Sequence, residues 1–136
     1  MLTREKFVIS LFVLLSLSKV ADAAPTEKEI AWVESIFDNN AADDLANLKV
    51  CGKLGLHSQY LQSLLGAGIA HPQTDPIKIT ALVRQIQRKA ESLAEMRTRF
   101  KEEGSRAPEE FESGCRFDVG QAVKHLEALD DFIIES

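Results

Sequence analysis

Apolar residues recur every three to four positions along most of the chain, and this period predicts helices rather than strands. The recurrence is interrupted at glycine, proline, asparagine and aspartate residues, which divide the chain into separate helical segments. Few positions show the strict alternation of apolar and polar residues that a half-buried strand would need, so strands are not expected. The pattern predicts an all-α protein, a small irregular helical bundle of about five helices.

Two helices are expected near the start of the folded part of the chain. Thr26 and Glu29 stand in a capping-box pattern, in which the two side chains satisfy backbone amides of the first helical turn. A helix over roughly 26–38 follows, because apolar residues recur there at helical spacing. The polar pair Asn39-Asn40 is expected to end this helix, and a second helix is expected from about 41 to 51.

Glycines divide the middle of the chain. Residues 53–57 are expected to form a turn, and Ser58 can cap a short third helix that carries Tyr60 and several leucines. The run Gly66-Ala67-Gly68 is expected to stop that helix, because glycine is unfavourable in a helix interior.

The longest predicted helix begins at Asp75-Pro76, where the aspartate can cap the helix and the proline occupies a position whose missing amide costs nothing. Its apolar stripe continues to Gly104. The following residues, 105–114, are expected to form a polar loop around a proline. Asp118 and Gln121 resemble a second capping box and predict the start of the last helix.

The first residues have the pattern of a secretory signal. A short basic start precedes an apolar run over 7–18, which is too short for a bilayer span of about 20 residues. Ala21 and Ala23 provide the small side chains that a signal peptidase requires, so cleavage is expected after Ala23. We therefore expect a signal peptide over 1–23 and a single helical domain over 24–136, secreted or periplasmic, with no stable membrane insertion after cleavage.

Cys51 and Cys115 both follow the expected cleavage point. An even number of cysteines in an exported chain predicts a disulfide, here joining these two residues. Two free buried thiols and a bridge between two chains are the alternatives. Each cysteine has a glycine neighbour, Gly52 or Gly114, which permits two backbones to approach closely. The bridge would staple the early helices to the last one.

The sequence contains no assembled catalytic, cofactor or metal motif. Gly52-Lys53 lacks the first glycine and the hydroxyl residue of a phosphate-binding loop. No two histidines have the spacing of paired metal ligands on one helix. Met96 and His125 are a conceivable pair of haem ligands, but a methionine in an apolar stripe usually packs in the core. No enzyme activity, cofactor or metal is therefore expected.

The charge balance also limits the partners. The chain carries 16 Lys plus Arg against 21 Asp plus Glu, a formal net charge of −5 at pH 7. Nucleic-acid binding usually needs a basic face, so no nucleic-acid partner is expected.

The function predicted from the sequence is binding to a protein partner in the envelope or the extracellular space. Trp32, Tyr60 and Phe111 are the aromatic residues expected on an exposed partner surface. A periplasmic ligand carrier, marked by an enclosed apolar pocket, is one alternative. A stress-type chaperone is another, which rests only on the general plan of a cleaved signal, a helical chain and a single disulfide.

Overall fold

Helices account for nearly all of the chain that the structure, a computed structural model, describes: residues 24–104 and 107–136. The predicted signal peptide and cleavage point over 1–23 lie outside the described residues. The elements are α2 (Glu27–Ser35), the π-helix η1 (Ile36–Asn40), α3 (Ala41–Val50), α4 (Leu54–Ala70), α5 (Pro76–Glu103) and α6 (Pro108–Glu135). The described ranges contain no strand, so the all-α prediction is confirmed.

The predicted break at Asn39-Asn40 is not a break. The chain passes from α2 through η1 into α3 without leaving the helical conformation, and the backbone N–H of Ala41 bonds the carbonyl of Ile36, five residues earlier. An α-helical bond spans four residues, so η1 accommodates one extra residue in a turn. The described part of the chain therefore has four helices rather than about five.

The predicted limits of α4 were also wrong. The helix begins at Leu54 rather than Ser58, and it continues through Gly66 and Gly68 to Ala70. Each glycine lies where another helix approaches closely. A Cβ atom on Gly66 would come within 2.7 Å of the Ile133 Cδ1 atom of α6, and one on Gly68 within 2.5 Å of the Ile79 Cδ1 atom of α5. Tertiary packing thus outweighs the poor helix propensity of glycine, which is about 1 kcal/mol per residue.

Helix α5 begins where the sequence predicts. The Asp75 side chain accepts a hydrogen bond from the Ile77 backbone N–H, and Pro76 is the first helical residue. Gly104 ends the helix in the left-handed conformation, with φ of 41°.

Helix α6 begins much earlier than predicted. Its first residue is Pro108, within the expected polar loop, and the Glu110 carboxylate accepts a hydrogen bond from the Ala107 N–H. Asp118 and Gln121 therefore lie inside the helix and do not cap it. Cys115, which was expected before the start of the last helix, is likewise a helical residue.

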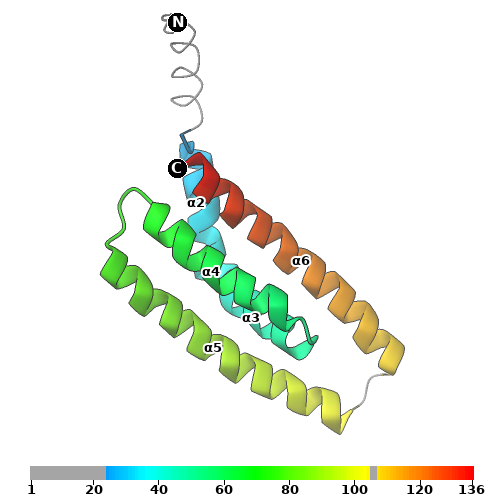
Figure 1. The fold of residues 1–136 in the computed structure, drawn as a ribbon. Helices are drawn as coiled ribbons and strands as arrows, with labels where there is room; N and C mark the ends of the chain where they lie inside the picture. Colours follow the sequence, from blue (N-terminus) through cyan, green and yellow to red (C-terminus); the bar gives the residue numbers. More distant parts are fainter. Residues whose placement is uncertain (1–23, 105–106) are drawn as a thin grey trace, which may run out of the picture.

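The paired α3 and α4 segments lie in the middle of the molecule, with α5 along one side and α6 along the other (Figure 1). The largest fully buried side chains come from α2, η1, α3, α4 and α6: Val33, Ile36, Leu45, Leu48, Tyr60, Leu64, Leu129 and Phe132. Helix α5 adds Val83 and Ile86 to the same core. The short α3 segment therefore contacts all three long helices.

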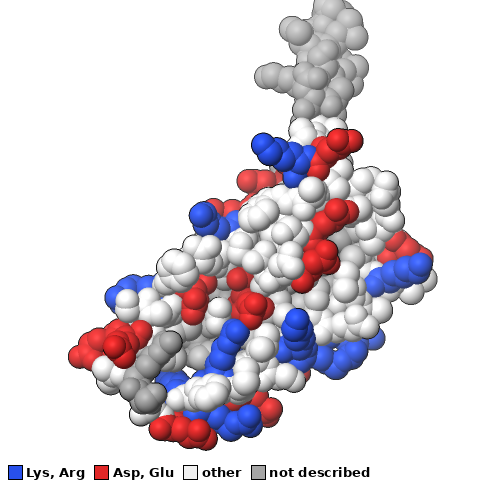
Figure 2. Space-filling model, turned by 180° about the vertical axis from the view of Figure 1, so that it is seen from behind, with Lys and Arg blue, Asp and Glu red and all other residues white. Residues whose placement is uncertain are grey.

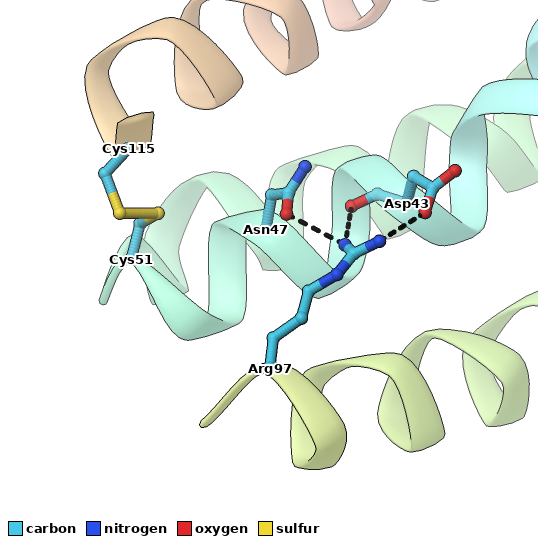
Figure 3. Close-up of a disulfide and its surroundings, with 5 residues drawn as sticks. All are labelled: Asp43, Asn47, Cys51, Arg97 and Cys115. Atoms are coloured by element: carbon cyan, nitrogen blue, oxygen red, sulfur yellow. Dashed lines mark hydrogen bonds and ion pairs between the residues drawn. A yellow bond between two sulfur atoms is a disulfide. The ribbon is translucent and has the colours of Figure 1, made fainter. Parts of the chain in front are cut away.

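Two further links hold α3 to its flanking helices (Figure 3). The predicted disulfide is present: Cys51, directly after α3, bonds Cys115 of α6, with their Cα atoms 5.7 Å apart. On the other side, the Arg97 guanidinium of α5 donates hydrogen bonds to the side chains of Asp43 and Asn47, at 2.7 and 2.8 Å. The covalent bond fixes the end of α3 against α6, and the arginine fixes its exposed face against α5.

Candidate functional site

A groove of about 270 Å³ lies between the α2–η1 segment, the end of α4 and the start of α5. Its lining residues come from α2, η1, α4, α5 and the connection between α4 and α5: Val33, Glu34, Phe37, Asp38, Ala67, Gly68, His71, Thr74, Ile79 and Leu82. The groove is partly open to solvent. It combines an apolar floor with polar side chains at its edge, which is the usual composition of a binding site.

The π-helix forms one wall of the groove. Phe37 and Asp38 belong to η1, and both line the groove. Because a π-turn contains one more residue than an α-turn, it widens the helix locally and changes the direction of the side chains on either side. Single π-turns occur frequently at functional sites, since the regular bonding of the helix is given up there. A departure from α-helical bonding therefore coincides with the groove.

The floor of the groove depends on the close approach of α4 and α5. Ile79 is buried and lies against Gly68, which also lines the groove. Leu82, one turn further along α5, is 38% exposed, and Phe37 opposite is half-buried. The groove thus presents apolar side chains that the protein covers only in part.

The edge of the groove carries two carboxylates, Glu34 and Asp38, both exposed. His71 lies beside them, and its Nε2 atom is 2.8 Å from the Glu34 Oε2 atom. The Gln73 backbone N–H donates to the other ring nitrogen, Nδ1. A nitrogen that accepts carries no proton, so the proton is on Nε2 and is donated to Glu34. This pair links the end of α4 to α2 at the edge of the groove.

A second polar cluster is buried in the core. One carboxylate oxygen, Asp44 Oδ2, accepts a hydrogen bond from the Tyr60 hydroxyl at 2.6 Å and lies 2.6 Å from the Nδ1 atom of His125. The Trp32 ring packs edge-on against the His125 ring, with centroids 5.6 Å apart. Helices α2, α3, α4 and α6 each contribute one side chain to this cluster.

Burial determines the protonation behaviour of the cluster. Removal from water raises the pKa of Asp44, and the hydrogen bonds from Tyr60 and His125 oppose that rise. The pKa of Tyr60 is raised above its ordinary range, first by burial and then by the neighbouring carboxylate. The tyrosine therefore remains a hydrogen-bond donor, and its hydroxyl satisfies the buried carboxylate. This cluster could not be predicted from the sequence, because its members lie far apart along the chain.

The three aromatic residues predicted as a partner surface do not lie together. Tyr60 is completely buried, so its assignment to an exposed surface was wrong. Trp32 is 47% exposed and packs on α6. Phe111 lies under the Lys101 ammonium group, 4.5 Å from the ring centroid. Phe111 and His125 both lie in α6, about 21 Å apart along the helix axis. Because Trp32 packs against His125, Phe111 is remote from Trp32.

Met96 and His125, the conceivable haem ligands of the sequence analysis, lie apart in the structure. His125 lies in α6 and is bound to Asp44, whereas Met96 lies on α5, on the other side of the α3–α4 pair, and is partly exposed. Within residues 24–104 and 107–136, no three His, Cys, Asp or Glu side chains form a group that could hold a metal ion. No helix in these same ranges is both long enough and apolar enough to cross a membrane.

Comparison of the chain with protein-family models, curated proteins and solved structures finds no match. The groove therefore has to be interpreted from its own geometry and charge.

Proposed function

We propose that this protein is an exported binding protein without enzymatic activity, which docks a protein partner in the groove walled by η1. The observation that supports this most directly is the combination of a π-helical wall, a partly exposed apolar floor and an open shape. The volume of about 270 Å³ lies just below the roughly 300–1,000 Å³ of small-molecule sites. It suits bulky side chains of a partner better than an enclosed ligand, which favours protein binding over a carrier role.

The buried cluster supports a binding role rather than a catalytic one. Within this cluster, Asp44, Tyr60 and His125 could act as acid or base, but they are buried and bonded to one another. A general acid or base must reach the atom to which it transfers a proton. The hydroxyl of Tyr60 is fully buried, and the cluster does not line the groove.

Export is part of the proposal. It rests on the signal pattern over 1–23 and on the disulfide, which persists in oxidising compartments such as the periplasm or the extracellular medium. A single helical domain over 24–136 would then be the active form. Mass analysis of the protein recovered outside the cytoplasm should show Ala24 as the first residue. Retention of Met1 in that material would contradict processing.

Site-specific photo-crosslinking in the native cells tests the binding role. A photoreactive amino acid replaces Leu82 in the groove or, as the matched control, Ile134, which is 80% exposed on α6 and does not line the groove. We expect a discrete adduct with another protein from position 82 and none of the same size from position 134. Identical adducts at both positions, or none at position 82, would contradict docking in the groove.

A further inference from the structure

We infer that the groove recognises a partner segment that presents a bulky apolar side chain next to a lysine or arginine. This inference rests on the proposed function and adds the chemistry of the partner. It follows from two observations. The first is the set of side chains that surround the groove, and the second is the charge among them that no oppositely charged residue in the described part of the chain pairs with.

The charge at the groove edge is negative. Glu34 and Asp38 both line it, four positions apart along the first helix, and none of the lining residues is a lysine or arginine. His71 occupies one oxygen of Glu34. Among the described residues, Asp38 forms no salt bridge, and it is exposed on the π-helix. A partner with an anionic group would be repelled here, whereas a cationic side chain would be attracted.

The floor requires an apolar group beside that cation. Phe37 and Leu82 face the groove with part of their surface in water, and Ile79 and Val33 fill the space beneath them. Figure 2, which views the molecule from behind, shows acidic side chains set among uncharged surface in the upper half of this face. A bulky aliphatic or aromatic side chain would displace water from the floor, and its lysine or arginine neighbour would reach the carboxylates. Amphipathic helices dock into grooves in this way.

The charge of the whole molecule acts in the same direction. The formal net charge of −5 attracts a basic segment and repels a strongly acidic one, mainly through the association rate. This long-range attraction is screened by salt, over about 10 Å at 0.1 M ionic strength. The exposed contact with Asp38 would also weaken in salt, but it would still depend on which residues meet in the groove.

Selection from a random peptide display library tests the inference. The oxidised protein, purified as it is exported, is immobilised, and the enriched peptides are synthesised and their affinities measured by fluorescence anisotropy. We expect the enriched peptides to combine a Leu, Ile, Phe or Trp anchor with Lys or Arg nearby. Asp38→Asn should weaken their binding by about two- to fivefold, because one exposed ion pair is lost. Leu82→Ser should weaken it by about tenfold or more, because apolar contact with the floor is lost.

Two control variants separate a local effect from a general one. Glu127→Gln removes one negative charge from an exposed position on α6 that does not line the groove. It should change the affinity for the peptides much less than Asp38→Asn does. Ile134→Ser removes an exposed apolar side chain elsewhere and should leave affinity unchanged. Thermal unfolding of every variant verifies that the fold is retained, which is expected because the substituted side chains are exposed.

The outcomes distinguish the two proposals. Enriched peptides that are acidic or uncharged, but still lose affinity with Leu82→Ser, would overturn the basic partner and leave groove binding in place. Peptides that bind Leu82→Ser and Asp38→Asn as well as the unsubstituted protein would overturn both proposals, and so would a failure to enrich any peptide. Equal losses for Asp38→Asn and Glu127→Gln would show that only net charge matters, which contradicts recognition at the groove edge.

Discussion

The Nδ1 atom of His125 lies 2.6 Å from the Oδ2 atom of Asp44, which is 81 positions earlier in the chain. The same oxygen accepts the Tyr60 hydroxyl, so a single buried carboxylate connects α3, α4 and α6. Most of the remaining core is hydrocarbon, which packs without directional preference. This polar contact has directional requirements and therefore fixes how the three helices are placed relative to one another.

Replacement of Asp44 with alanine should strongly destabilise the protein. It leaves the Tyr60 hydroxyl and the His125 ring buried without their partner, and the cost should be about 2–4 kcal/mol. Urea denaturation measures it. Asp43→Ala is the matched control on the neighbouring residue, whose exposed pair with Arg97 should contribute at most about 1 kcal/mol. Similar losses for the two variants would show that the buried cluster has no special role.

The contribution of Asp44 to stability should fall as the pH rises. Burial raises its pKa in the folded state above the usual 3.8, so the folded protein holds this proton more tightly than the unfolded chain does. The stabilisation is complete below pH 3.8 and is lost as the pH rises through the folded-state pKa. Asp44→Asn removes this titration. As the pH rises, the unsubstituted protein should therefore lose unfolding free energy relative to this variant. A difference between the two proteins that stays constant from pH 3 to pH 7 would contradict the raised pKa of Asp44.

The disulfide should contribute about 2–4 kcal/mol to stability, because it closes a long loop in the unfolded chain. Cys51→Ser combined with Cys115→Ser should lower the melting temperature by several degrees or more. Reduction of the unsubstituted protein should have the same effect, while the double variant should not respond to reductant. A melting temperature that stays constant after verified reduction would show that the bridge does not stabilise the fold.

Gly68→Ala should destabilise the protein although alanine favours helices. The added methyl group would meet the Ile79 Cδ1 and Cγ1 atoms at 2.5 and 2.7 Å, and overpacking of this kind typically costs about 1–3 kcal/mol. Gly120→Ala is the control within α6, because apart from the helix's own backbone and the two neighbouring residues no atom of the described residues lies within 4 Å of the position of its Cβ atom. That variant should gain up to about 1 kcal/mol from helix propensity. Chemical denaturation should thus give opposite signs for the two substitutions, and equal signs would refute the close contact between α4 and α5.

Local signals in the sequence predicted well wherever local physics decides the structure. The Thr26–Glu29 capping box and the Asp75-Pro76 helix start are present as expected, since each depends on residues within one turn. The disulfide was predicted from the number of cysteines and their expected compartment. The early start of α6 was missed although Pro108 followed by two glutamates is itself a helix-start pattern.

Features that depend on tertiary packing could not be predicted in this way. Gly66 and Gly68 look like helix breakers until Ile133 and Ile79 are seen to occupy the space that their side chains would need. Tyr60 looks like an exposed aromatic residue until its buried carboxylate partner is known. The groove is formed by three segments that meet only in the folded protein, so no single stretch of sequence reveals it.

The extra residue in η1 makes this wall of the groove separable from the rest of the fold. A π-turn takes up one residue more than an α-turn, so deletion of one residue within 36–40 would restore a regular α-turn and keep α2 and α3 in nearly the same rotational phase. Val33 would stay in the core and Trp32 would stay against His125, while the positions of Phe37 and Asp38 at the groove would change. Descendants of this chain could therefore gain or lose this wall of the groove by a single-residue insertion or deletion, without repacking the core.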